Sequence, residues 1–225
     1  MGSVQIQSHT TKFPISMIGE EAGVCWGADV SSGERNYKRG VECLSNNHGR
    51  TFEFPDVYMV IDGYSARVIR EWYTHIGGSP TRLQASTRYI DYTKQFEYVT
   101  PESIARNQES NQVYENIMCN IFSGMEELRR LGVPVEDTSL CLPLGMSTKI
   151  VCKHNLRNLI DMSHQRMCRR AYHEFRKLFI DVGNALRSYS DEWKYIVENY
   201  FMPKCIVSGF CNEKYTCGMM PKKDR

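Results

Sequence analysis

The stretch Thr81-Arg82-Leu83-Gln84-Ala85-Ser86-Thr87-Arg88-Tyr89 brings two arginines together with several hydroxyl and amide side chains. An arginine guanidinium offers paired donors that match phosphate oxygens, and the hydroxyl of Ser86, two residues before Arg88, can reach the same anion. The alternative is a solvated turn, because Gly77-Gly78 and Pro80 precede the stretch. The stretch therefore predicts either a phosphate-binding segment or an exposed loop.

The overall composition is that of an ordinary globular protein, with 41% hydrophobic and 24% charged residues among 225, so a full core can form. A formal net charge of +2 is too small for nonspecific attraction to nucleic acid or membranes. No apolar run is long enough to cross a bilayer, and the polar start, residues 1–12, lacks the apolar core of a signal peptide. We expect a single cytoplasmic domain, residues 1–225, without nucleic-acid or membrane partners.

The nine cysteines do not suit a disulfide framework, because their number is odd, and they fit a reducing compartment. Cys205, Cys211 and Cys217 recur at even spacing in a C-terminal tail, residues 203–225. Three thiolates and a fourth ligand could hold zinc, but structural zinc sites usually carry short Cys-x-x-Cys pairs, which this tail lacks. We therefore expect free thiols and no metal site, with zinc as the alternative.

The middle of the chain predicts a strand followed by a helix. Residues 51–61 are rich in β-branched and aromatic side chains, and Pro55 confines the start of this strand to an edge. Apolar residues at helical spacing then predict a helix that ends at Gly77-Gly78. They are Ile69, Trp72, Tyr73 and Ile76. His75 is thus expected in the last turn, beside the arginine-bearing stretch.

The second half predicts long helices and one more strand. A helix from Thr100-Pro101 to Gly132 is expected to be core, with Val113, Ile117, Ile121, Leu128 and Leu131 as its apolar stripe. Alternation over residues 146–154 predicts a strand. A later helix carries the stripe Ala171, Phe175, Leu178, Phe179, Val182 and Leu186. Because the first fifty residues are only weakly periodic, we expect a loosely specified segment there. The predicted fold is α+β, with long helices packed on a short mixed sheet.

The sequence contains no arrangement that is typical of covalent catalysis. Ser/His/Asp spacing, paired carboxylates, a His-Glu metal helix and a glycine-rich dinucleotide turn are all absent from the sequence. Two arginine-bearing blocks, around Arg88 and around Arg157 and Arg166, suit a polyanionic ligand held in a fixed orientation. The alternative for the second block is weak surface pairing with Asp161 and Glu174.

The order of these features resembles the flavin-dependent thymidylate synthases, whose signature is RHRxxSxNExSxRY. Ser86, Arg88 and Tyr89 match the terminal SxRY, Gln84 stands where the family often has Glu or Gln, and His75 matches the histidine of RHR. The likeness extends over residues 47–182. The other matching positions are His48 with Glu53, Leu142-Pro143-Leu144, Asn155-Leu156-Arg157, Arg166 and Ala171-x-x-Glu174-Phe175-Arg176. Two separate blocks in the family's order are a specific signal.

The resemblance implies a homotetramer that binds FAD and methylates dUMP at C5, using methylenetetrahydrofolate as the carbon donor and NADPH as the reductant. The flavin carries the hydride chemistry, whereas the protein supplies orientation and electrostatics. On this resemblance, Ser86 and Arg88 hold the dUMP phosphate and Gln84 contacts the nucleotide. Arg166 binds the uracil, where a fixed cation stabilises negative charge on the ring.

The resemblance also implies a set of flavin contacts. His75, Asn155 and Arg157 are expected to contact FAD, with Arg82 in place of one arginine that the signature has lost. His48 is expected near the flavin and folate, and it joins Arg166 as a predicted catalytic residue. In this family these groups come from more than one subunit, so they need not meet within one chain.

Four departures from the family pattern bear on specificity. The two arginines of RHR are Thr74 and Ile76 here, and each charge-assisted contact is worth about 1.5 to 3 kcal/mol. Glu71 replaces a glutamine that holds the substrate phosphate, and Ser139 stands where an arginine is expected. Two alternatives follow: a UMP/dUMP methylase or hydroxymethylase of a specialised pathway, and a catalytically inactive nucleotide-binding homologue.

Overall fold

The computed structural model describes residues 2–223, which form two compact units. Of these residues, the first unit comprises 2–3, Ile61–Thr74 and Leu83–Val151, and the second comprises Val4–Val60, His75–Arg82 and 152–223. Strands β2 (Asp56–Ser65) and β4 (Ser147–Asn155) each contribute residues to both units. Each unit is described below by itself.

The sheet has four strands in the order β1-β2-β4-β3, in which β1 is Ser3–Ile6 and β3 is Thr81–Gln84. Strands β2 and β4 run in opposite directions. At one end of the pair Ala66 N donates to Met146 O at 2.8 Å, and at the other end Leu156 N donates to Pro55 O at 2.9 Å. The predicted α+β class is confirmed, but the sheet is small and antiparallel rather than mixed.

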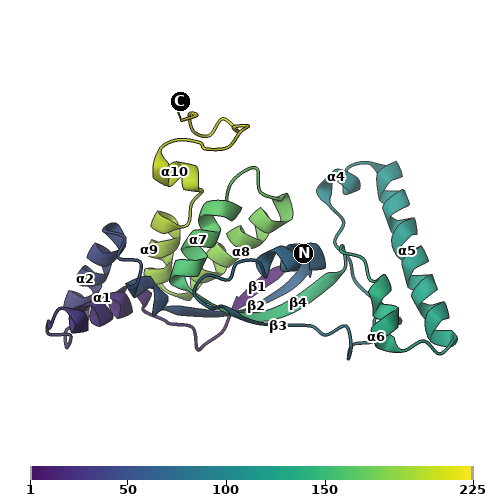
Figure 1. Cartoon of the computed structure of the whole chain (residues 1–225), viewed down its shortest axis with the longest axis horizontal. Coiled ribbons are helices and arrows are strands. Elements are labelled where there is room, and N and C mark those ends of the chain that lie inside the picture. Colours follow the sequence, from purple (N-terminus) through teal and green to yellow (C-terminus); the bar gives the residue numbers. More distant parts are fainter. Residues whose placement is uncertain (1, 224–225) are drawn as a thin grey trace. The chain divides into compact units, whose positions relative to one another are not determined.

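The second unit contains the C-terminal helices α7 (Leu156–Arg166), α8 (His173–Tyr189), α9 (Asp191–Tyr200) and α10 (Lys204–Ser208), as Figure 1 shows. The apolar stripe predicted for α8 is confirmed from Phe175 to Leu186, and Ala171 precedes the helix. Helix α7 was not predicted. It begins because Asn155 caps it, with the side chain accepting a hydrogen bond from Asn158 N at 2.9 Å.

Residues 2–50 fold into strand β1 and two helices, so the prediction of a loosely specified segment is wrong. They contain helices α1 (Pro14–Cys25) and α2 (Gly33–Ser45), which pack closely against each other. The contact is made by glycines: a Cβ at Gly19 would lie 1.8 Å from Asn36 O, and one at Gly40 would lie 1.9 Å from Ile15 O. A helix pair that meets through glycine leaves only a weak apolar pattern in the sequence.

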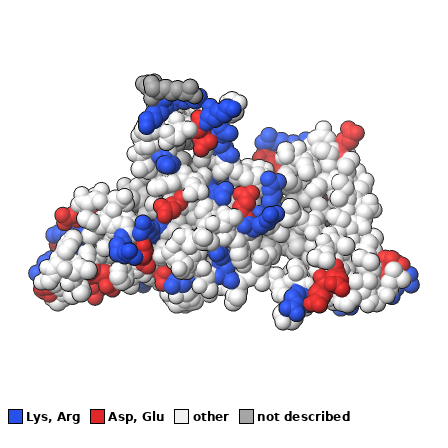
Figure 2. All heavy atoms as spheres, in the orientation of Figure 1, with Lys and Arg blue, Asp and Glu red and all other residues white. Residues whose placement is uncertain are grey.

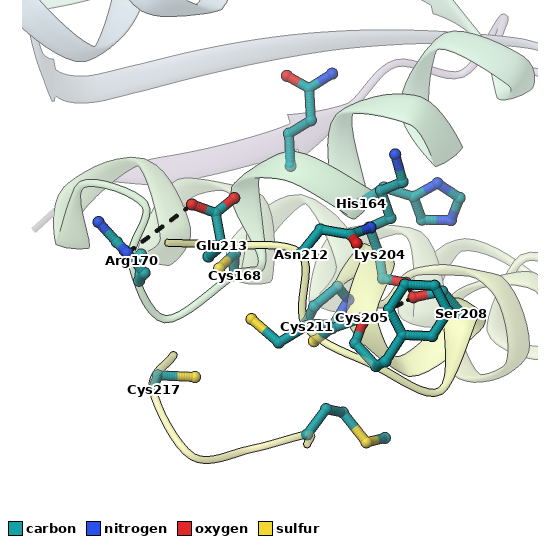
Figure 3. Close-up of a pocket in the computed structure, with 14 residues that line it drawn as sticks. His164, Cys168, Arg170, Lys204, Cys205, Ser208, Cys211, Asn212, Glu213 and Cys217 are labelled. Carbon is teal, nitrogen blue, oxygen red and sulfur yellow. Dashed lines mark hydrogen bonds and ion pairs between the residues drawn. The ribbon is translucent and has the colours of Figure 1, made fainter. Parts of the chain in front are cut away.

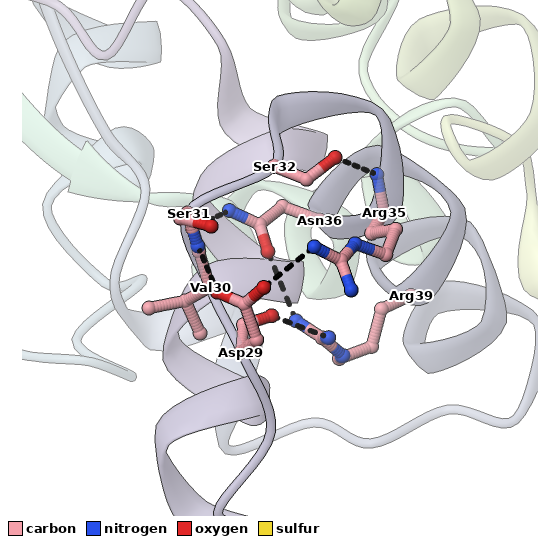
Figure 4. Close-up of polar contacts among 7 residues, drawn as sticks. All are labelled: Asp29, Val30, Ser31, Ser32, Arg35, Asn36 and Arg39. Atoms are coloured by element: carbon pink, nitrogen blue, oxygen red, sulfur yellow. Dashed lines mark hydrogen bonds and ion pairs between the residues drawn. The ribbon is translucent and has the colours of Figure 1, made fainter.

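Polar side chains fix the segment that leads into α2, as Figure 4 shows. Ser32 caps the helix by accepting from Arg35 N, and Arg35 pairs with Asp29 at 2.5 Å. Arg39 donates to Gly19 O on α1 at 2.7 Å and to Asn36 Oδ1 at 3.0 Å. The Arg39 bond to Gly19 O links α2 directly to α1, and the bonds of Ser32 and Asp29 fix the start of α2.

We expect Gly19→Ala to cost about 3 kcal/mol of unfolding free energy, the upper end of the usual overpacking range, because the new methyl group meets backbone. Urea unfolding measures this cost. Gly33→Ala is the matched control, since nothing lies within 4 Å of a Cβ at Gly33. Equal stability of the two variants would contradict the close α1–α2 contact.

The first unit contains α3 (Ala66–Trp72), α4 (Glu102–Ala105), the long helix α5 (Gln108–Arg130) and α6 (Val135–Thr138). Its buried cluster is formed by Phe96, Met118, Met125 and Met146. The stripe predicted to be core on α5 is wrong in part, because Val113 is 54% exposed, Ile117 48% and Leu131 65%. On α5 the buried residues are Met118 and Met125, whereas Val113 and Ile117 are exposed.

Two predicted boundaries also differ from the structure. Strand β2 begins at Asp56, after the 3-10 helix η1 (Thr51–Glu53), and a second such turn, η2, covers Ser139–Cys141. Helix α3 ends at Trp72, and Ile76 is 72% exposed. His75 therefore follows the helix instead of lying in its last turn.

The distribution of surface charge and the polarity of the helices both fit the amino-acid composition. Basic and acidic side chains are interspersed on the face shown in Figure 2, in keeping with the formal net charge of +2. Within residues 2–223, every helix is too short or too polar to cross a bilayer.

Candidate functional site

His75, Arg166 and Phe175 form a compact cluster in the second unit. Arg166 Nε donates to His75 Nε2 at 2.8 Å, and the guanidinium carbon lies 4.5 Å from the centroid of the Phe175 ring. The His75 and Phe175 rings meet edge to face, with centroids 5.9 Å apart. The ring beneath the guanidinium and the imidazole beside it together limit the rotamers of Arg166.

The imidazole of His75 is neutral at physiological pH. Burial lowers its pKa to about 4, and the positive charges of Arg166 and Arg82 act in the same direction. Since Nε2 accepts from Arg166, the proton of the neutral ring lies on Nδ1. His75 thus binds one arginine and keeps a single N–H donor.

A second histidine, His154, lies fully buried behind this cluster and donates from Nδ1 to Asn158 Oδ1 at 2.5 Å. Burial lowers its pKa to about 4, against the effect of the Asn158 hydrogen bond. The unfolded chain then binds more protons than the folded chain between about pH 4 and pH 6.5. The contribution of His154 to stability is complete above about pH 6.5 and is lost as the pH falls towards 4.

We expect His154 to account for about 2 kcal/mol of the stability lost between about pH 7.5 and about pH 5, at 1.36 kcal/mol per pKa unit. Urea unfolding of the parent and of His154→Gln at both pH values measures this contribution. The His154→Gln variant should show the flatter pH dependence. His9→Gln, at an exposed histidine, is the control. An unchanged slope in His154→Gln would contradict the neutral buried state.

Asn155 and Arg157 lie at the start of α7. The Asn155 amide donates to Gly78 O at 3.3 Å, which ties the segment after α3 to this helix. Gly78 adopts φ +71°, and a Cβ there would lie 2.3 Å from the Asn155 side chain, so glycine is required. Arg157 pairs with Glu53 at 2.5 Å rather than with Asp161, the partner that the surface-pairing alternative predicted.

A cleft of about 860 Å³ runs beside Arg157. Its lining includes Asn47, Gly49, Arg50 and Asp161. His48 lies between two of these residues, is exposed, and meets the ring of Trp26 edge to face at 6.3 Å. The volume is within the range of small-molecule and cofactor sites.

The remaining predicted residues belong to the first unit, except Arg82, whose charge acts on both buried histidines of the second. Gln84 donates to Thr148 Oγ1 at 3.3 Å, at the end of the edge strand β3. The exposed turn that follows carries Ser86 and Arg88, and Ser86 Oγ accepts from Arg88 N at 3.2 Å. The quoted stretch is thus half strand and half turn.

Arg88 and Ser139 show how this turn is held. The Arg88 side chain is 68% exposed and pairs with Glu136 of α6 at 3.2 Å. Such an exposed pair is weak, so an anion can displace the carboxylate. The Ser139 hydroxyl lies 2.8 Å from both Thr87 O and Val135 O, and it can donate its one proton to either carbonyl. The serine therefore supports the backbone of the turn.

A family profile described as thymidylate synthase complementing protein matches residues 9–189. The chain belongs to this family. A flavin-dependent thymidylate synthase from Pyrococcus furiosus is 29% identical to it over 214 residues, which span 91% of this chain and 87% of that protein. The resemblance stated from the sequence motifs is confirmed.

Two solved structures share the fold of this member of the thymidylate synthase complementing protein family. ThyX from Helicobacter pylori with FAD and dUMP aligns with a TM-score of 0.69 at 19% identity, covering 89% of this chain and 99% of that one. The UMP/dUMP methylase PolB from Streptomyces cacaoi, bound with 5-Br dUMP, aligns with a TM-score of 0.72 at 14% identity, covering 89% and 96%. At these identities the likeness shows the fold alone.

One residue of the cluster was not predicted as functional. The sequence marked Phe175 only as a core position of α8, although its ring also lies under the Arg166 guanidinium. The available signal was its place within the family's Ala171-x-x-Glu174-Phe175-Arg176 pattern, shortly after Arg166. Apolar periodicity predicts that the Phe175 side chain is buried, but it does not predict which group packs against the face of the ring.

Proposed function

We propose that this protein is an FAD-dependent thymidylate synthase, which methylates dUMP at C5 to dTMP with methylenetetrahydrofolate and NADPH. The observation that carries the proposal is the family match over residues 9–189. The named activity of the Pyrococcus furiosus relative and the FAD and dUMP of the Helicobacter pylori structure support it. We further propose that the chain acts as a single cytoplasmic domain.

Three residues of the first unit would bind the nucleotide phosphate and sugar. The hydroxyl of Ser86 and the exposed guanidinium of Arg88 are donors of the kind that phosphate oxygens accept. Gln84 precedes them as the last residue of the edge strand β3 and would contact the nucleotide. This arrangement supports a phosphate-binding turn of which Ser139 holds the backbone.

Arg166 would bind the uracil ring. Its guanidinium is oriented by His75 and Phe175, so its position is fixed before substrate arrives. A fixed cation at the ring stabilises the negative charge that develops when C5 becomes the nucleophile. Because His75 is neutral, it orients the Arg166 guanidinium without adding a charge of its own.

The flavin would be held by His75, Arg82, Asn155 and Arg157, with His48 nearby on the folate side. These residues fit an anionic dinucleotide, because they offer two guanidinium groups, a neutral imidazole and an amide. Arg157 also lines the cleft of about 860 Å³. Bound FAD supplies the hydride chemistry, and the protein binds and orients. Arg157 would exchange its Glu53 partner for a phosphate or the ring.

The enzyme would act as a homotetramer with shared sites. The half-exposed apolar residues Val113 and Ile117 on α5 support this proposal, since a second copy would remove them from water. We expect Ile117→Glu to shift the protein to smaller assemblies in light scattering. Ser188→Glu, at an exposed polar position of α8, should remain tetrameric. An intact tetramer in Ile117→Glu would contradict the role of this face.

The two alternatives to this proposal are an enzyme with a changed acceptor and an inactive homologue. The replacements at Thr74, Ile76, Glu71 and Ser139 favour a changed acceptor, so that UMP is methylated or a base is hydroxymethylated. A single ribose hydroxyl is hard to exclude by packing, with an effect of roughly 100-fold, so a small change suffices. The same replacements would also suit an inactive nucleotide-binding homologue.

Flavin titration and product analysis separate these functions. A yellow protein whose reduced flavin is oxidised by methylenetetrahydrofolate and dUMP, with dTMP identified by mass, is the expected result. Products from UMP, or a hydroxymethylated base, would favour the changed acceptor. A colourless protein that takes up no FAD would overturn the proposal in favour of the inactive homologue.

A further inference from the structure

The C-terminal tail beyond α10 has little apolar burial to hold it. After Gly209 the residues are mostly exposed, and Cys211 is the buried one among the described residues of this segment. Its backbone is tied at a few points: Cys211 N donates to Pro221 O at 2.7 Å, and Arg170 donates to Tyr215 O at 2.6 Å. Ordering a residue costs about 1 to 2 kcal/mol, so this segment needs a further source of stability.

Four cysteines surround one pocket at the base of this tail, as Figure 3 shows. Cys205 lies on α10, and Cys211 and Cys217 follow it at equal spacing. The fourth, Cys168, comes from the turn between α7 and α8. The pocket has a volume of about 280 Å³. The tail itself contains three cysteines, and the structure places Cys168 at the same pocket as a fourth.

The four thiols line a single pocket, as Figure 3 shows. A divalent cation bound there would stabilise several thiolates at once. Among residues 2–223, however, no three ligand side chains already stand close enough together to hold a metal ion. The thiols must therefore turn inward on binding.

We propose that Cys168, Cys205, Cys211 and Cys217 bind one Zn²⁺ as four thiolates and thereby fasten the tail to the turn after α7. Four thiolates make the closed tetrahedral set of structural zinc sites. Each thiol releases one proton to solvent on binding, and no electrons are exchanged because zinc is not redox-active. A disulfide between two of these thiols would instead need an oxidant to take up two electrons.

The surroundings of the pocket suit the charge of such a site. Zinc with four thiolates carries a net charge of −2, and the cations Arg170 and Lys204 line the same pocket. Glu213 is already paired with Arg170 at 3.9 Å. His164 and Glu213 also line the pocket and are competing ligands of other types. Replacement of His164 tests whether the imidazole is needed besides the four sulfurs.

Metal analysis of the full chain tests the proposal without any measurement of enzyme activity. Protein purified under reductant, and protein reconstituted anaerobically with Zn²⁺, should each retain one zinc per chain after gel filtration. Cys217→Ser and Cys168→Ser should weaken zinc binding by at least about 100-fold, beyond the usual 10- to 100-fold effect of outer-shell changes. Cys25→Ser, at an exposed thiol, and His164→Ala should retain the metal.

Cobalt substitution identifies the ligands. Co²⁺ in place of zinc should give the intense visible bands of a tetrahedral thiolate site, and these should be lost in Cys217→Ser. Zinc should also slow tryptic cleavage after Lys214. No metal retained by the reconstituted parent, equal retention in Cys217→Ser, iron in place of zinc, or a disulfide among the four cysteines in freshly isolated protein would each overturn the proposal.

Discussion

Arg166→Ala is expected to lower kcat for dUMP methylation by about 100- to 1000-fold, the effect of removing one preorganised charge-stabilising group. The physical reason is the fixed position of the Arg166 guanidinium. The guanidinium lies 4.5 Å from the Phe175 ring and is bound to neutral His75, so the cation is oriented before the reaction begins. Product formation and oxidation of reduced flavin, each followed at saturating dUMP, measure the loss.

The folded state and the flavin should survive this change. Arg166 ends α7 and is half-buried, so the helix does not depend on its side chain. Arg187→Ala, an exposed arginine in the last turn of α8, is the matched control and should keep full activity. Full activity in Arg166→Ala would mean that the pyrimidine binds elsewhere.

Arg88→Ala is expected to raise the KM for dUMP by about 10- to 150-fold, which corresponds to the 1.5 to 3 kcal/mol of a charged hydrogen bond. Since the phosphate does not change during the reaction, kcat should change much less. Steady-state kinetics over a wide range of dUMP concentrations separates the two parameters. Deoxyuridine, which lacks the phosphate, should be used equally poorly by the parent and the variant.

Glu136→Gln is the informative partner of this variant. In the structure Glu136 competes with the substrate phosphate for Arg88, at 3.2 Å. Removal of its charge should leave the KM unchanged or lower it. If Glu136→Gln raised the KM as strongly as Arg88→Ala, the pair would be structural and the phosphate would lie elsewhere.

The sequence motifs assigned residues from distant segments to one predicted site. Motif order identified His75 and Arg166 from distant segments, and the structure brings these two side chains within 2.8 Å. The sequence also predicted α8, because that helix buries large apolar side chains at regular spacing. It missed the α1–α2 pair because the contact there is made by Gly19 and Gly40, which carry no apolar side chain.

Tertiary context decided the remaining differences. Periodicity on α5 marked Val113 and Ile117 as core, yet the buried residues of this helix are methionines and these two side chains are exposed. Whether one face of a helix is exposed to water depends on the elements that pack around it and not on the sequence of the helix alone. Helix α3 ends before His75, so His75 lies in a loop. The hydrogen bond from Asn155 to Gly78 fixes this loop, and no local sequence pattern predicts that contact.

A crystal structure of the full assembly with FAD and dUMP tests the central claim most directly. The account predicts the guanidinium of Arg88 at the nucleotide phosphate and that of Arg166 at the uracil, with the flavin ring stacked against the base. A structure that holds both ligands while Arg88 and Arg166 face solvent, away from either one, would contradict it.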